Sequence, residues 1–144
     1  GGMIDKFMGD CIMGIFGAPL DMDNHAEMAI KSCKEIEDKV KELKVLYKER
    51  GLPDINVGTG VTTGTAIVGN MGSKTRLDYS VVGDAVNLAA RLEATAGRHE
   101  HIDNKTIWSS YTQELLPDTF KTKSIGEIKV KGKEELIQIY TFQS

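Results

Sequence analysis

The segment that most constrains this chain is an apolar helix, which the sequence predicts to begin near Asp84, directly after a short strand and Gly83. Apolar residues surround most of this helix, which indicates burial. They are Ala85, Val86, Leu88, Ala89, Ala90 and Leu92. Asp84, Asn87 and Arg91 interrupt the pattern at spacings of three and four, so they share one helix face. We expect Asp84 to be the N-cap. Arg91 needs an anionic partner there, either an internal carboxylate or a bound phosphate.

The composition predicts a single soluble domain. The chain has 144 residues, of which 40% are hydrophobic and 27% charged, and its net charge of −3 favours neither a nucleic-acid partner nor an anionic membrane. Two cysteines form no disulfide framework, and no apolar run of about 18 residues occurs. We therefore expect a cytoplasmic segment, whether or not a longer parent protein is tethered to a membrane.

Two short strands at the start predict a hairpin. Residues 3–8 and 11–16 are apolar runs, and Gly9-Asp10 between them is typical of a two-residue turn. Asp10 then lies at the tip, and Lys6 lies on the strand face shared with Ile4 and Met8. Ordinary structural roles remain open for both residues: turn formation for Asp10 and a reach past the sheet edge for Lys6.

A long helix is predicted next. Asp23 or Asn24 caps this helix, and Asn24 with Glu27 three residues later resembles a capping box. The helix runs for about 25 residues until Gly51 and Pro53 stop it. Its apolar stripe favours packing on a sheet over a coiled-coil partner. The stripe consists of Ala26, Ala29, Cys33, Ile36, Val40, Leu43 and Tyr47.

The middle of the chain predicts a second hairpin, formed by residues 55–61 and 66–68. Gly58 and Gly60 lie on one face of its first strand, where another group approaches closely. Residues 69–76 read as a polar, basic loop, and residues 77–82 as the strand that leads into the helix at Asp84.

The last part predicts a short helix over residues 104–111, capped by Asp103, and strands over 120–125 and 136–142. Lys131 lies between them in a Val-Lys-Gly-Lys turn, which serves either as a solvated turn or as a phosphate clamp. The order of elements predicts an α+β domain with a mostly antiparallel sheet and helices on one side of it.

The polar residues that their local structure does not require point to nucleotide chemistry. A carboxylate with cationic and amide side chains suits a nucleoside triphosphate and a divalent metal, and the chain has no P-loop sequence. No Ser-His-Asp or Cys-His arrangement can be assigned, and His25, His99 and His101 lack evident partners. The candidates are Lys6, Asp10, Ser80, Asn87, Arg91 and Lys131.

Three ordered motifs resemble the class III adenylyl/guanylyl cyclase catalytic domain. Residues 1–19 resemble its second signature, residues 77–93 its later signature, and residues 130–133 its C-terminal turn. The resemblance covers nearly the whole chain. It implies that residues 1–144 form one partial, ferredoxin-like cyclase domain, which lacks the first strand and first helices of the family.

The resemblance also implies a role for each candidate. Asp10 corresponds to the second of two aspartates that bind Mg²⁺ or Mn²⁺, and Lys6 and Ser80 occupy the base-reading positions. Asn87 corresponds to the residue that orients the ribose, Arg91 to the one that stabilises charge on the α-phosphate, and Lys131 to the contact with the terminal phosphates. In the family, the asparagine and arginine of one subunit serve the metal site of the other, so the resemblance implies a homodimer that cyclises a nucleoside triphosphate in signal transduction.

Lys6 favours ATP as the substrate. A lysine is only a donor, and adenine N1 is an acceptor, whereas guanine N1 carries a hydrogen. Ser80 departs from the aspartate or threonine usual in adenylyl members, and we expect ATP selectivity to be retained but loosened. The family's first metal aspartate has no counterpart in these residues, so we expect the 144-residue stretch alone to be inactive.

Two alternatives remain open at this point. One is a non-catalytic cyclase-like module for nucleotide binding or dimerisation, and the other is a guanylate cyclase. A diguanylate cyclase is disfavoured, because Gly9-Asp10 is followed by Cys11 rather than by a Glu-Phe pair.

Overall fold

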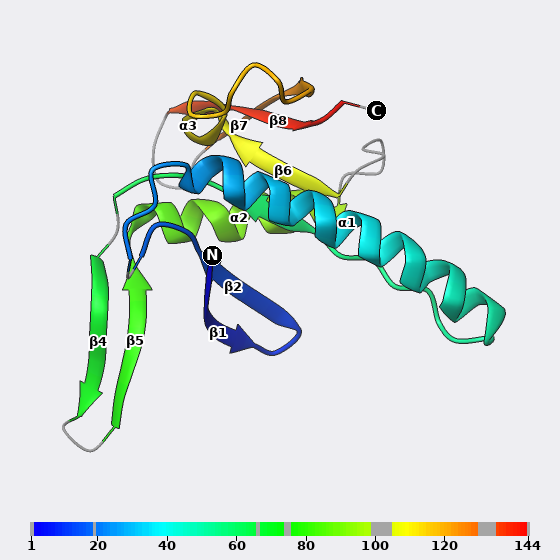
Figure 1. Cartoon of the computed structure of the whole chain (residues 1–144), viewed down its shortest axis with the longest axis horizontal. Coiled ribbons are helices and arrows are strands. Elements are labelled where there is room, and N and C mark those ends of the chain that lie inside the picture. The colour runs from blue at the N-terminus through cyan, green and yellow to red at the C-terminus, as the bar shows by residue number, and fades with distance from the viewer. Residues whose placement is uncertain are drawn as a thin grey trace.

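The computed structural model describes residues 2–18, 20–65, 67–73, 76–98, 105–129 and 135–143; within these, residues 5–8, 67–73, 76–82 and 98 are described by their backbone. Eight strands and three helices occur in this described part (Figure 1). In chain order they are β1 (Met3–Met8), β2 (Cys11–Ile15), α1 (His25–Glu49), β3 (Thr59–Val61), β4 (Ile67–Ser73), β5 (Arg76–Val82), α2 (Asp84–Arg98), β6 (Thr106–Ser109), α3 (Ser110–Gln113), β7 (Thr122–Lys129) and β8 (Leu136–Phe142).

A four-stranded sheet forms the centre, with the strand order β3-β6-β8-β7. β3 and β6 are parallel, and the β6–β8 and β8–β7 pairs are antiparallel. β1–β2 and β4–β5 are separate antiparallel hairpins. The expected α+β class with mostly antiparallel pairing is therefore confirmed.

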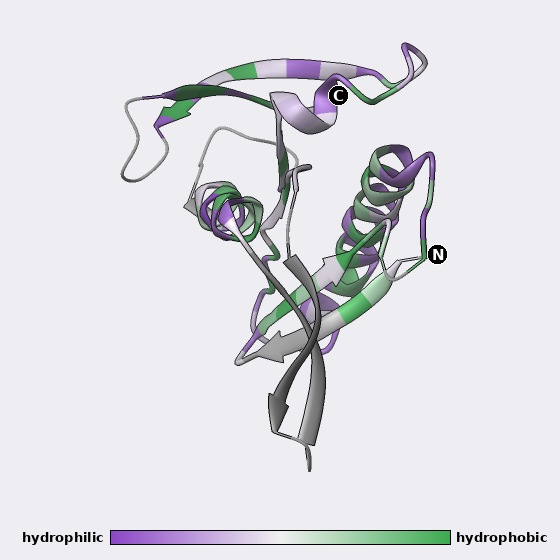
Figure 2. Ribbon diagram, turned by 90° about the vertical axis from the view of Figure 1, so that its left-hand side faces the viewer, coloured by the Kyte–Doolittle hydropathy of each residue, from purple (hydrophilic) through white to green (hydrophobic). Residues whose placement is uncertain are grey.

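The two long helices cover opposite faces of this sheet, which corrects the prediction of helices on one side. Ile107 packs with Leu88 and Leu92 of α2, whereas the next residue, Trp108, packs with Ile30 of α1. Successive residues of a strand point to opposite faces. Figure 2 shows one long helix end-on and the other obliquely, well separated from each other.

The predicted hairpin of residues 55–61 with 66–68 is wrong. β3 is only three residues long and pairs in parallel with β6, so Thr59 lies opposite Thr106. The predicted polar loop over 69–76 is wrong as well, because β4 and β5 pair from Ile67 opposite Val82 to Ser73 opposite Arg76. The glycines and polar residues of this arm disguised its strands, since such residues are depleted in ordinary sheets.

The helix predicted over residues 104–111 is mostly a strand. Thr106–Ser109 form β6, all four residues are buried, and only Ser110–Gln113 are helical. A strand covered on both faces has no polar alternation, so its pattern cannot be distinguished from that of a buried helix. The predicted cap, Asp103, lies outside the described residues.

Helix α1 spans His25–Glu49, close to the prediction, but the capping box does not form. Asn24 is the N-cap and makes no side-chain cap hydrogen bond. All of the buried residues of α1 lie in its first half. Ile36 of the predicted stripe is 45% exposed, and the second half of the helix extends past the sheet (Figure 1).

Cys33 predicts a pH dependence of stability. Burial, together with the nearby Glu37 carboxylate, raises the pKa of the Cys33 thiol from 9.0 to about 12. The folded state therefore favours the protonated thiol, so this contribution to stability is complete below pH 9 and is lost as the pH rises toward 12. We expect the free energy of unfolding to fall by up to about 1.4 kcal/mol per pH unit in this window. Urea unfolding at several pH values should show a shallower decline for Cys33→Ala, and an equal decline would contradict the assignment.

Candidate active site

The β1–β2 hairpin places Asp10 at an exposed tip, as predicted. Gly9 has a φ of +60° and makes the two-residue turn, and Met8 lies opposite Cys11. Asp10 is exposed beside it. A shift in register between Ile4 and Lys6 marks a bulge, which interrupts the alternation on which the predicted shared face of Ile4, Lys6 and Met8 depended.

The strands that carry Lys6 and Ser80 are neighbours. Lys6 lies in β1 opposite Met13, and Ser80 lies in β5 opposite Gly69. β1 and β5 contact each other, and β5 leads directly into α2. β1, β5 and α2 therefore lie in one region of the fold. Lys6 and Ser80 are described by their backbone only.

Helix α2 begins at Asp84, as predicted, but Asp84 is not its N-cap. The Gly83 carbonyl accepts hydrogen bonds from the backbone N–H of Val86 (3.1 Å) and Asn87 (3.4 Å). Gly83 is therefore the N-cap, with a φ of +146° that suits glycine, and Asp84 is the first helical residue. An acidic residue in the first turn interacts favourably with the helix dipole.

Helix α2 has one buried face and one exposed face, rather than being apolar on most sides. Leu88 and Leu92 are buried against Ile107, whereas Asn87 and Arg91 are exposed. The alanines of α2 made the helix look apolar on most sides in the sequence. Alanine is small and is compatible with both buried and exposed positions, so it does not show which face is buried.

Arg91 forms no ion pair with any residue in the described part of the chain, and the Asn87 side chain has no hydrogen-bond partner there. The Arg91 backbone carbonyl accepts a hydrogen bond from Thr95 Oγ1 at 2.8 Å. The internal salt bridge that the sequence left open for Arg91 is thus not found among described residues. Asn87 and Arg91 instead present an amide and a guanidinium to solvent, one helical turn apart.

Gly58, just before β3, and Gly60, within β3, let α2 approach this strand closely. A Cβ on Gly60 would lie 2.2 Å from Glu93 N, and one on Gly58 would lie 2.8 Å from Gly97 N. The sequence predicted a close approach at these glycines, which is confirmed, but it did not identify α2 as the approaching element. The backbone contact fixes the position of α2, and with it the positions of Asn87 and Arg91.

Asp10 suits a divalent cation as one ligand. Its exposed carboxylate supplies the oxygen donor that Mg²⁺ and Mn²⁺ prefer. Across the described ranges, no group of three or more His, Cys, Asp or Glu side chains is placed to enclose a metal ion. Lys131, His99 and His101 lie outside the described residues.

Among the helices of the described residues, none is long and apolar enough to cross a membrane.

Curated relatives include two bacterial adenylate cyclases. "Adenylate cyclase" of Anabaena cylindrica is 37% identical over 144 residues, which cover 97% of this chain and 28% of that protein. "Adenylate cyclase 1" of Rhizobium meliloti is 32% identical over 139 residues, which cover 96% of this chain and 20% of that protein. The chain therefore spans about a quarter of the length of these relatives.

Solved structures of both cyclase types share the fold. The adenylyl cyclase CyaB from P. aeruginosa has a TM-score of 0.85 and 32% identity, over 99% of this chain and 72% of that one. The guanylyl cyclase Cya2 has a TM-score of 0.80 and 31% identity, over 96% and 68% respectively. Residues 5–144 match the family model described as the adenylate and guanylate cyclase catalytic domain. With a match over nearly its whole length, the chain belongs to the adenylate and guanylate cyclase catalytic domain family.

Proposed function

We propose that residues 1–144 are part of an adenylate cyclase catalytic domain, which converts ATP to 3′,5′-cyclic AMP and pyrophosphate in signal transduction. The observation that carries the proposal is the exposed face of α2, where Asn87 and Arg91 lie without partners among the described residues on a helix fixed by backbone contact with β3. Membership of the family supports nucleotide cyclisation as the reaction, and Lys6 favours adenine.

The reaction joins the ribose 3′-oxygen to the α-phosphorus, breaks the bond to the β-phosphate oxygen and releases pyrophosphate, while the 3′-hydroxyl proton leaves to a base or to water. Asn87 would orient the ribose through its amide. Arg91 would donate charge-assisted hydrogen bonds to the α-phosphate oxygens, where negative charge develops. Asp10 would hold a divalent ion, which when bound activates the 3′-oxygen and neutralises the triphosphate. Lys131 would contact the terminal phosphates.

A homodimer would complete the site. Asp10 lies at the tip of the β1–β2 hairpin and Arg91 lies on α2. In the proposed dimer, Asp10 of one chain and Arg91 of the other chain act on the same ATP molecule. The β4–β5 arm projects from the rest of the molecule as a two-stranded ribbon (Figure 1). Such a ribbon is marginally stable in water by itself, which favours its being covered by a second copy.

Replacing Lys6 with glutamate should abolish ATP cyclisation. The glutamate is an acceptor and would face the N1 acceptor of adenine, whereas the N1–H of guanine would suit it. We expect cyclic AMP formation by the full-length protein to fall about 100-fold or more, with a smaller loss or a gain for GTP. Lys41→Glu, on an exposed site of α1, makes the same change of charge and should leave both rates unchanged. Unaltered ATP turnover in Lys6→Glu would refute the base-reading role.

A polypeptide of only these 144 residues should produce no more than traces of cyclic AMP, even with Mn²⁺. Asp10 contributes one carboxylate, and binding two divalent ions requires more. Incubation with ATP and quantification of cyclic AMP tests this directly. Substantial product would show that other residues of the stretch complete the metal site.

Guanylate cyclase activity is the second candidate. It is favoured by the similarity to the guanylyl cyclase Cya2 and by the hydroxyl of Ser80, which both donates and accepts. Parallel assays with ATP and GTP on the unaltered protein distinguish the two, because the proposal requires the higher kcat/KM for ATP. A non-catalytic module would form neither product.

A further inference from the structure

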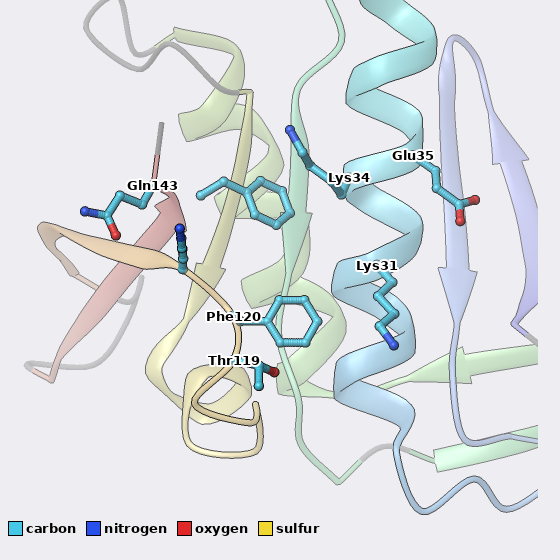
Figure 3. A pocket seen from close by; sticks show the side chains of 8 residues that line it. Lys31, Lys34, Glu35, Thr119, Phe120 and Gln143 are labelled. Carbon is cyan, nitrogen blue, oxygen red and sulfur yellow. The ribbon is translucent and has the colours of Figure 1, made fainter.

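A groove lies between the first half of α1 and the segment formed by residues 119–121 and the end of β8 (Figure 3). Its volume is about 360 Å³, within the range of ligand-binding clefts. Phe120 and Phe142 give it an apolar floor; Phe120 points toward α1, and Phe142 packs edge-on against Trp108 with the ring centroids 4.8 Å apart.

Lysines surround this aromatic floor. Lys31, Lys34 and Lys121 line the groove, and Lys34 Nζ lies 5.5 Å from the centroid of the Phe142 ring. The one acidic residue among the described lining residues, Glu35, points away from Phe120 (Figure 3). The chain as a whole carries a net charge of −3, so this local excess of positive charge does not follow from its composition.

Two of these lysines already bind carboxylates, but weakly. Lys31 Nζ lies 3.0 Å from Glu27, and Lys34 Nζ lies 3.4 Å from Asp38. Both pairs lie within one helix; Lys31, Lys34 and Asp38 are exposed and Glu27 is partly exposed. Solvent-screened pairs of this kind contribute less than about 1 kcal/mol. A carboxylate bound in the groove can therefore replace these partners at little loss.

The walls of the groove are held in place before any ligand binds. On one side, Ile30 and Cys33 of α1 are buried against Trp108 and Phe142. On the other side, Gln143 N donates a hydrogen bond to the Lys121 carbonyl at 3.0 Å. A preformed groove loses little conformational entropy on binding.

We propose that this groove docks an acidic peptide segment of a partner protein, with one bulky apolar side chain on the aromatic floor and carboxylates on the lysines. The groove is open along α1 and its lysines are exposed, which suits an extended chain better than an enclosed small molecule. The recessed phenylalanines give such a peptide an anchor that a bare polyanion lacks. Helix α1 lies between the groove and the β1–β2 hairpin, so a docked segment leaves Asp10 accessible (Figures 1 and 3).

Fluorescence anisotropy of a labelled seven-residue peptide, six glutamates around a central phenylalanine, tests this proposal with the full-length protein. We expect saturable binding, weakened about tenfold in Lys34→Gln/Lys121→Gln, because two exposed charge pairs are lost. The matched control is Lys41→Gln, an exposed lysine of α1 outside the groove, which should change the affinity by less than about twofold. Phe120→Ala should weaken binding too, with folding of each variant checked by its thermal transition.

Several outcomes would overturn the proposal. One is the absence of saturable peptide binding; another is an equal loss of affinity in Lys41→Gln. Equal binding of a seven-glutamate peptide would show an anion site without the apolar anchor. Binding to phosphatidylserine vesicles without peptide binding would indicate a membrane surface instead. None of these readouts depends on cyclase activity, so the proposed function can fail while this proposal stands.

Discussion

Replacing Gly60 with alanine is expected to lower the free energy of unfolding by about 3 kcal/mol or more. The added Cβ would lie 2.2 Å from Glu93 N and 2.6 Å from the Ala89 carbonyl oxygen. Both atoms belong to the backbone of α2, so no side chain can rotate away and the helix must move from β3. Urea unfolding of the protein measures the effect. Because α2 carries Asn87 and Arg91, cyclase activity should fall with it.

Gly97→Ala is the matched control for this prediction. Gly97 also lies at the α2–β3 contact region, but a Cβ built on it meets nothing within 4 Å. Alanine should therefore stabilise the helix by about 0.5–1 kcal/mol through its higher helix propensity. A Gly60→Ala variant within about 0.5 kcal/mol of the unaltered protein would show that the backbone contact does not fix α2.

Replacing Arg91 with alanine should reduce kcat for cyclic AMP formation by about 100- to 1000-fold. The guanidinium would lose its contact with the α-phosphate, where charge develops in the transition state. Arg91 is exposed and makes no ion pair in the described structure, so stability should change by less than about 0.5 kcal/mol. Steady-state kinetics and urea unfolding, measured on the same preparation, separate the two effects.

Mixing two inactive variants tests whether Arg91 serves a site shared between chains. Asp10→Asn disables the metal side of a site and Arg91→Ala the transition-state side. With random pairing, about half of the dimers are heterodimers, and each heterodimer has one intact site out of two. The mixture should therefore recover about one quarter of the activity of the unaltered protein. Recovery should be absent when either variant is mixed with itself. A mixture no more active than its components would place both residues in the same chain's site.

The sequence predicted the elements whose residues alternate or repeat with a clear period. The first hairpin and α1 follow from such patterns, with Gly9-Asp10 and Gly51 marking where they turn or end. β6 was missed, because a strand buried on both faces shows no alternation between Thr106 and Ser109. β3 was assigned to a hairpin, since three residues carry too little pattern to reveal a parallel partner more than 40 residues away.

The sequence supplied the candidate residues of the site but not their arrangement. Family-like motifs pointed to Lys6, Asp10, Ser80, Asn87 and Arg91. No local pattern showed that α2 leaves Arg91 exposed. The exposure of Arg91 depends on which side of α2 packs against Ile107 and Gly60, and those residues belong to distant strands. The signal for the close approach was present in the spacing of Gly58 and Gly60, and only the fold showed that α2 makes it.

Conversion of ATP by the full-length protein is the most direct test of the proposed function. The protein is incubated with ATP and Mg²⁺ or Mn²⁺, and the products are identified by mass spectrometry. We expect equal amounts of 3′,5′-cyclic AMP and pyrophosphate, with a lower kcat/KM for GTP. A protein that forms no cyclic nucleotide, or that prefers GTP, would contradict the proposed function.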